Sequence, residues 1–240
     1  LDMEASAFLL DFAFDPKENI WAIGTDNEGG YFLHKFDQNG REIQTVELTE
    51  ILGPSDASST ERELFMSIDA QGNICVAQKG GSTSVYLFDN EGRFLFSLNY
   101  EGTLMTTITT AQGQIGVCAT AADRMNYDLL YVDMNNRDWD EDRIPLGATA
   151  GLYGGSSNNF YRFDSASLYG YPAGSQEGRQ IFGWTDVGLG ASDVHLGELS
   201  DGRFLVLAAS PDQTAALSYE MAAVSYTHLR AHETSQDLVC

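Results

Sequence analysis

The chain has 240 residues, of which 43% are hydrophobic, and its 35 acidic and 13 basic side chains give a formal net charge of -22. This charge argues against nucleic acid or an anionic membrane surface as a partner, because phosphate binding needs clustered Lys and Arg. No apolar run approaches the roughly 18 residues of a membrane span, so we expect no direct membrane insertion by this segment.

A repeated pattern of strand, tight turn and strand begins near the N-terminus. Residues 14–22 and 68–76 each place a turn that starts with Asp, followed by Asn, between two apolar runs, at an offset of 54 residues. Residues 35–43 and 87–95 repeat a second, Asp-x-x-Gly turn at an offset of 52 residues. Such turns reverse a strand tightly, and the runs between them are rich in β-branched and aromatic residues, which favours short strands.

Further copies of the pattern follow along the chain. Residues 110–115 and 199–204 repeat the first turn, and residues 131–136 are a degraded copy of the second. Between the first two units, residues 49–63 form a polar, Ser-rich connection in which one short turn of helix is expected.

Two hairpins in a unit of about 40–50 residues are typical of a propeller blade. We therefore predict an all-β fold, a partial (open or truncated) β-propeller of four to five four-stranded blades that spans residues 1–223. The predicted blades cover residues 8–48, 64–99, 104–146, 157–184 and 192–220. An ordinary β-sandwich with coincidental turns is the alternative.

Residues 159–171, Asn-Phe-Tyr-Arg-Phe-Asp-Ser-Ala-Ser-Leu-Tyr-Gly-Tyr, precede a Trp-Thr-Asp segment at 184–186 and an Asp-Gly-Arg turn at 201–203. This order resembles the propeller region ahead of the transport domain in large extracellular solute-binding lipoproteins of Gram-positive bacteria. The resemblance implies a non-enzymatic binding or scaffold module of a transport system, secreted and anchored at the cell surface. Its expected partners are a peptide, a glycan or an adjoining solute-binding domain.

The C-terminal segment differs in character from the rest. Residues 224–234 resemble the translation of a transposase adapter used in sequencing libraries, and Leu-Val-Cys at 238–240 resembles the fixed end of that adapter. We expect residues 224–240 to be an artefactual tail and the natural protein to continue past Ala223. His228 and His232 have the i, i+4 spacing of a zinc pair on a helix. Because they lie in the expected artefactual tail, we assign them no function.

Five aromatic residues are candidates for lining a ligand-binding face. They are Trp21, Tyr86, Tyr161, Tyr169 and Trp184. Aromatic side chains also fill the layers between blades, and a single step of strand register separates the two roles. Loops at residues 25–30, 79–84 and 122–126 are the candidates for a ligand-binding mouth of the propeller.

No catalytic residue is predicted. His34 and His195 lie in apolar runs without a nearby Ser or Cys nucleophile motif, so we expect packed or surface strand residues. The alternative function is a propeller-type lyase or hydrolase with an active site at the mouth of the channel. That function requires these two histidines to converge near the axis.

No metal or cofactor is predicted. The acidic run at Asp133, Asp138, Asp140, Glu141 and Asp142 lacks the Asp-x-Asp-x-Asp-Gly spacing of a calcium loop, which favours a solvated hairpin. Cys75 and Cys118 occupy similar strands of successive units. We expect buried free thiols there, with a disulfide as the alternative.

Overall fold

The computed structural model describes residues 5–53, 64–110, 113–121, 125–154, 160–171, 177–187, 193–198, 203–210 and 213–220. The chain divides into two compact units, residues 1–148 and 149–240, and each is described by itself. The predicted tail at residues 224–240 lies outside the described part, so its artefactual origin stays a prediction. Among the described residues, no helix has the length and apolar character needed to cross a membrane.

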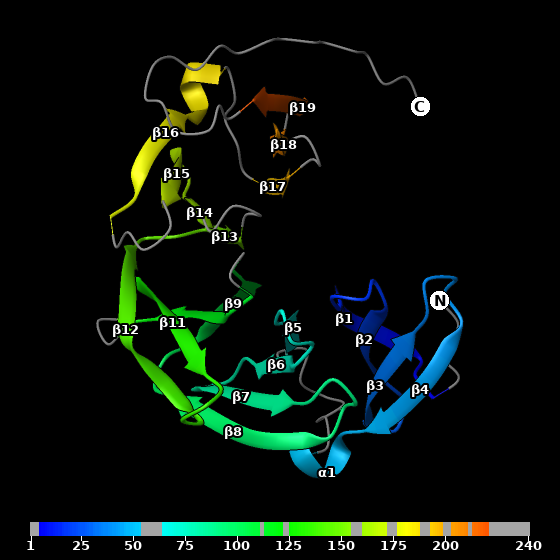
Figure 1. Ribbon diagram of the computed structural model, residues 1–240. Helices are drawn as coiled ribbons and strands as arrows, with labels where there is room; N and C mark the ends of the chain where they lie inside the picture. Colours follow the sequence, from blue (N-terminus) through cyan, green and yellow to red (C-terminus); the bar gives the residue numbers. More distant parts are fainter. Residues whose placement is uncertain are drawn as a thin grey trace. The chain divides into compact units, whose positions relative to one another are not determined.

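The first unit contains three four-stranded antiparallel sheets, each with its strands in chain order (Figure 1). The first sheet consists of β1 (Phe8–Phe14), β2 (Ile20–Thr25), β3 (Tyr31–Phe36) and β4 (Glu42–Glu47). The second consists of β5 (Leu64–Ile68), β6 (Ile74–Gln78), β7 (Thr83–Phe88) and β8 (Phe94–Tyr100). The third consists of β9 (Leu104–Thr109), β10 (Ile115–Thr120), β11 (Tyr127–Asp133) and β12 (Asp138–Gly147).

The sheets of the first unit are arranged as blades. Strand β1 lies beside β5, and β5 lies beside β9, so the first strands of successive sheets meet one another. Asn19 and Asn73 directly precede β2 and β6, the second strands of their sheets, as the repeat predicts. The predicted all-β, partial β-propeller is therefore confirmed. The predicted helical turn is also present, as α1 (Thr49–Leu52).

Asp side chains hold the repeated turns. The Asp15 carboxylate accepts hydrogen bonds from the backbone N–H of Lys17 and Asn19 and from the Asn19 amide, at 2.8–2.9 Å. Asp69 accepts the same set of bonds from Gln71 and Asn73. Desolvation by burial is the largest single influence and raises the pKa of the Asp15 carboxyl, but the hydrogen bonds from Asn19 and Lys17 and the charge of Lys35 together hold this pKa below its usual value.

The face of the first blade that meets the second blade is a closed apolar core. Trp21, Ile23 and Leu33 project from this face, and each is fully buried. They pack against residues of the second blade that include Met66 and Ile74. Burying side chains of this size contributes about 1.5–3 kcal/mol each, so this layer holds the two blades together.

The second unit contains two sheets. Strands β13 (Gly151–Gly154), β14 (Phe160–Phe163), β15 (Ser167–Tyr171) and β16 (Arg179–Gly183) form a four-stranded sheet, followed by the 3-10 helix η1 (Trp184–Val187). Strands β17 (Asp193–Glu198), β18 (Arg203–Ser210) and β19 (Gln213–Glu220) form the other. The fourth blade thus begins with β13, before the predicted residue 157. The sequence pattern missed this strand because Gly-Leu-Tyr-Gly lacks the β-branched residues typical of strands.

Candidate functional site

The candidate ligand-binding aromatics of the first unit lie at the interface between the first two blades. Trp21 is fully buried there, with the Lys35 ammonium 4.7 Å from its ring centroid. Tyr86 is partly buried and packs against the same core cluster. This placement gives Trp21 a packing role, while a ligand-binding role for Tyr86 stays a prediction.

The aromatics of the second unit are also largely enclosed. Tyr161 and Trp184 are 2% exposed, and Trp184 Nε1 donates a hydrogen bond to the Asp164 carbonyl at 2.9 Å. Tyr169 is only partly buried, and the Arg162 guanidinium lies 3.9 Å from its ring centroid. Within this unit, Tyr169 is the predicted ligand-binding residue that keeps an accessible ring.

The three candidate mouth loops are equivalent connections. Residues 25–30 join β2 to β3, residues 79–84 lead from β6 into β7, and residues 122–126 join β10 to β11. Each therefore links the second strand of a blade to the third. Of the last loop, residues 122–124 lie outside the described part of the chain, and ligand binding by all three loops stays a prediction.

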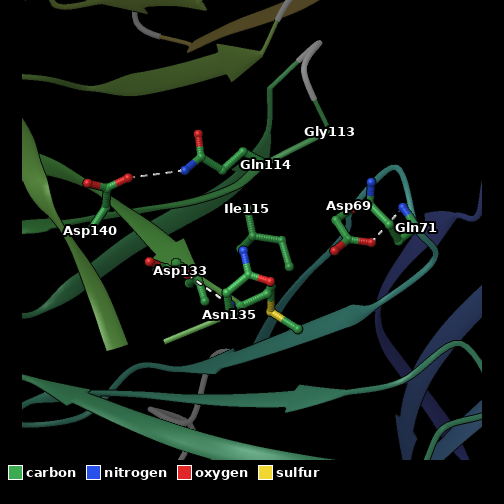
Figure 2. Close-up of a pocket in the computed structure, with 10 residues that line it drawn as sticks. Asp69, Gln71, Gly113, Gln114, Ile115, Asp133, Asn135 and Asp140 are labelled. Atoms are coloured by element: carbon green, nitrogen blue, oxygen red, sulfur yellow. Dashed lines mark hydrogen bonds between the residues drawn. The ribbon is translucent and has the colours of Figure 1, made fainter. Parts of the chain in front are cut away.

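A polar pocket of about 330 Å³ lies between the second and third blades, within the first unit (Figure 2). The turns of both blades line it, together with the start of β12. Its lining residues are Asp69, Gln71, Gly113, Gln114, Ile115, Val132, Asp133, Met134, Asn135 and Asp140. Figure 2 shows the Gln114 amide directed at Asp140, with 3.5 Å between Nε2 and Oδ2.

Two carboxylates of this pocket already hold turns. Asp69 caps the β5–β6 turn, and Asp133 accepts bonds from the backbone N–H of Asn135 and Asn136 and from the Asn136 amide. These bonds lower the pKa of Asp133 below its usual value. The lining contains no Ser, His, Lys or Arg. The pocket can therefore bind polar groups, but it holds no nucleophile with a neighbouring base.

The acidic run that surrounds Trp139 forms part of the β11–β12 hairpin, as the sequence predicts for a solvated hairpin. Asp133 caps its turn, and Trp139 Nε1 donates to the Asn99 carbonyl at 3.1 Å. The side chain of Asp142 is outside what the structure describes. Among the described residues, no group of three or more His, Cys, Asp or Glu is placed to hold a metal ion.

The two cysteines of the described part of the chain, Cys75 and Cys118, are free, buried thiols. Cys75 lies on β6 and Cys118 on β10, at equivalent strands of successive blades, as predicted. Desolvation by burial raises the pKa of each thiol to about 12. Neither cysteine is therefore a nucleophile at neutral pH, because the thiolate is the reactive form.

A second constellation lies on the first blade, on the face opposite the Trp21 core. The Ser6 hydroxyl oxygen is 2.8 Å from His34 Nε2, and His34 Nδ1 is 2.5 Å from Glu42 Oε1. His34 is fully buried, the Glu42 side chain is 19% exposed, and Ser6 is partly exposed. We refer to these three residues as the Ser6 relay.

For a neutral imidazole, the proton positions in the Ser6 relay follow from which groups can donate and which can accept a hydrogen bond. An ionised carboxylate can only accept, so His34 Nδ1–H donates to Glu42. His34 Nε2 is then the acceptor of the Ser6 O–H. Thr45 Oγ1 also lies 2.5 Å from Glu42 Oε1 and fixes this carboxylate further. A hydroxyl, an imidazole base and an orienting carboxylate form the arrangement that activates a serine nucleophile.

Small residues on β2 make room for the relay. His34 on β3 is paired with Ala22, so its ring lies over a small side chain. A Cβ at Gly24 would come within 2.7 Å of Ser6 Cβ and Oγ and within 2.9 Å of the Phe8 carbonyl oxygen. Glycine at this position therefore lets the segment before β1 approach the sheet face closely enough for Ser6 to reach His34.

The sequence missed this site. His34 is a packed strand residue, as expected, but a serine does lie beside it, 28 positions away in the chain. The alternative enzyme function required His34 and His195 to converge near the axis, and this requirement stays untested, because His34 lies on β3 in the first unit. His195 lies on β17, in the second unit.

No protein family model matches the sequence, and no curated protein matches it. The fold is similar to solved β-propellers at low sequence identity. A periplasmic gluconolactonase from Pseudomonas aeruginosa has a TM-score of 0.61 and 15% identity, over 93% of this chain and 70% of that one. A catalytically inactive virginiamycin B lyase from Staphylococcus aureus, with quinupristin, has a TM-score of 0.58 and 9% identity, over 93% and 74%.

A third similar structure is the β-propeller domain of the trilobed protease from Pyrococcus furiosus, with a TM-score of 0.56 and 11% identity, over 98% of this chain and 73% of that one. The prediction that the chain is not an enzyme is wrong as an inference from its fold, since a gluconolactonase and a lyase share the architecture. The finer resemblance to solute-binding lipoproteins, with its secreted and surface-anchored location and its partners, stays a prediction. At these identities the likeness establishes the β-propeller fold.

Proposed function

We propose that this propeller is a hydrolase that cleaves an ester or a lactone, with Ser6 as its nucleophile. The observation that carries the proposal is the unbroken chain of hydrogen bonds from the Ser6 hydroxyl through His34 to Glu42. The gluconolactonase among the similar propellers supports a lactone or ester as the substrate class. Such substrates present an electrophilic carbonyl carbon and an alcohol leaving group.

Each residue of the relay has a defined role in this reaction. Ser6 Oγ attacks the carbonyl carbon while His34 Nε2 takes its proton. The bond from the carbonyl carbon to the leaving oxygen then breaks, and His34 returns the proton to that oxygen. Water, deprotonated by His34, hydrolyses the acyl-serine and regenerates Ser6. Glu42 acts as a positioning residue, because it holds the imidazole in the required tautomer and stabilises its protonated form.

The burial pattern of the relay fits these roles. The His34 ring is completely buried, and the low local dielectric around it strengthens its hydrogen bond to Glu42. Ser6, at the reacting end of the relay, is partly exposed, as is the Glu42 side chain at the other end, and the buried imidazole between them is held by both hydrogen bonds.

The test is steady-state hydrolysis of p-nitrophenyl esters and neutral lactones by the 240-residue chain and by its Ser6→Ala variant. Loss of the nucleophile should lower kcat by at least about a thousandfold. Ser97→Ala is the matched control, since Ser97 is an exposed serine on β8, outside the relay and the candidate loops. Retained activity in Ser6→Ala, or no hydrolysis of either class by the unmodified chain, would overturn the proposal.

A further inference from the structure

We propose that the polar pocket between the second and third blades binds one neutral sugar unit. The residues that line it all belong to the first unit, and none of them is part of the Ser6 relay. The proposal is therefore independent of the hydrolase function. Three properties of the pocket carry it: its place between two blades that are already joined, its apolar floor and the hydrogen-bonding groups of its walls.

The two blades that form the pocket meet directly beside it. The Ala70 N–H donates to the Gly113 carbonyl oxygen at 3.1 Å, so a backbone hydrogen bond joins the β5–β6 turn to the β9–β10 turn. A Cβ at Gly113, where φ is +76°, would collide with Ala70, so glycine permits this close approach. Because these blades already share a core, a further blade would pack on an outer face of the unit and leave the pocket open.

The floor of the pocket is apolar. Ile115 and Val132 are 1% and 2% exposed and belong to the core cluster that the second and third blades share. Met134 packs against the same cluster and also lines the pocket. Ligand pockets commonly combine such an apolar surface with a few polar groups that orient the ligand. The C–H face of a sugar ring can therefore rest on this floor while its hydroxyls reach the walls.

The walls supply hydrogen-bond donors and acceptors together. Gln71, Gln114 and Asn135 each present a side-chain amide, with two N–H donors and one oxygen acceptor. Among the described residues, the amide groups of the Gln71 and Asn135 side chains have no hydrogen-bond partner. The Gln114 amide meets Asp140 only at 3.5 Å, the outer limit of a hydrogen bond (Figure 2). Because a hydroxyl both donates and accepts, this set suits a ligand that carries several hydroxyls.

The charge of the pocket favours a neutral ligand. The carboxylates of Asp69, Asp133 and Asp140 line it without any Lys, Arg or His, so an anionic sugar is repelled. Asp69 and Asp133 already accept hydrogen bonds from their own turns, and no described group of three His, Cys, Asp or Glu is placed to hold a metal ion. The lining also has no aromatic ring to face an organic cation. A volume of about 330 Å³ accommodates one neutral hexose unit.

The experiment is a proton–nitrogen NMR titration of the 240-residue chain with the α- and β-methyl glycosides of glucose, galactose and mannose. Separate arms use the corresponding uronic acids, methylammonium chloride and calcium chloride. We expect at least one neutral glycoside to shift the backbone amide signals of Gln114 and Asn135 in a saturable way. The uronic acid of the same sugar should bind at least about threefold more weakly, because its carboxylate meets the carboxylates of the pocket.

Asn135→Ala should raise the Kd of that glycoside at least about threefold, because one hydrogen bond to the ligand is lost. Asn39→Ala is the matched control. Asn39 lies in the β3–β4 turn of the first blade, and its N–H donates to Asp37 as the N–H of Asn135 donates to Asp133. Its replacement should leave the Kd unchanged.

Three outcomes would overturn the sugar site. They are the absence of a saturable shift with every one of these glycosides, an unchanged Kd in Asn135→Ala, and tighter binding of methylammonium or calcium than of any glycoside. The Ser6→Ala variant keeps this test apart from the hydrolase proposal, because it should bind the glycoside with the Kd of the unmodified chain. A Kd that changes in Ser6→Ala and not in Asn135→Ala would place the glycoside at the Ser6 relay instead.

Discussion

The two faces of the first blade contain the same four strands but differ in chemistry. One face carries Trp21 and Ile23, which are fully buried against the second blade. The other face carries the Ser6 relay, together with Phe12 and Phe14, which are 50% and 61% exposed. Successive residues of a strand project to opposite faces. The residues that stabilise the blade interface and those of the Ser6 relay are therefore separated by a single position along a strand. Substitutions on one face should therefore change unfolding, and substitutions on the other should change catalysis.

The largest expected effect is on the relay face. Glu42→Gln keeps an oxygen that can accept from His34 Nδ1–H but removes the charge that stabilises the imidazolium. We expect kcat for ester hydrolysis to fall by about 10³–10⁴-fold. The thermal unfolding midpoint should change little, and circular dichroism melting checks this in the same samples. A large loss of stability with unchanged kcat would assign Glu42 a structural role and break the comparison.

On the covered face, Trp21→Ala should lower the free energy of unfolding by about 3–5 kcal/mol, because it leaves a cavity in the layer between two blades. Urea denaturation followed by fluorescence or circular dichroism measures this. Phe14→Ala provides the contrast on the open face, where a change within about 0.5 kcal/mol is expected for an exposed side chain. Equal losses in the two variants would show that the open face is also packed against protein.

Gly24→Ala tests how the relay is assembled. The added Cβ would collide with Ser6 and with the Phe8 carbonyl oxygen, so the segment before β1 must move away from the sheet. We expect kcat to fall at least about tenfold, with a stability loss of about 1–2 kcal/mol. Hydrolysis and urea denaturation together provide the check. Activity that survives this change would mean that Ser6 does not need its position over Gly24.

The smallest effect concerns the pH dependence of stability. Asp11 lies at the boundary between the first two blades, where its carboxylate accepts from the Met66 N–H at 2.6 Å. Desolvation by burial raises its pKa above the usual value, despite the hydrogen bonds from Met66 and Phe12. Because the folded state binds this proton more tightly, its contribution to stability is present at low pH and is lost as the pH rises through the raised pKa.

Asp11→Asn removes that titration while keeping an oxygen for the Met66 N–H. The variant should therefore gain stability relative to the unmodified chain between pH 3.5 and pH 7, by less than about 1 kcal/mol. Urea midpoints at the two pH values give the result. A gain that is larger at pH 3.5 than at pH 7 would contradict the assigned direction of the pKa shift.

The blades could be predicted from the sequence because their turns are local. Asp15 and Asp69 bond to backbone groups two and four residues further along, so the repeat is visible in the chain itself. The fourth blade was misplaced at its start, because glycines at both ends of β13 disguise the strand. Residues that come together only after folding, such as Ser6 and His34, have no such local signal in the sequence.

The Ser6 relay shows where the sequence falls short. Its three residues come from the segment before β1, from β3 and from β4, and only the strand register brings them together. The same register decides that Trp21 faces the core and His34 the opposite side. A serine followed at a distance by a histidine and a glutamate has no diagnostic spacing, since triads are recognised by geometry.

The most direct test of the Ser6 relay is covalent labelling of the intact chain with a fluorophosphonate, followed by peptide mass spectrometry. The account predicts one phosphonylated serine, Ser6, with labelling that falls at least about a hundredfold in Glu42→Gln and is unchanged in Ser97→Ala. Labelling absent from Ser6, or equally fast in Glu42→Gln, would contradict the claim that this propeller contains an activated serine.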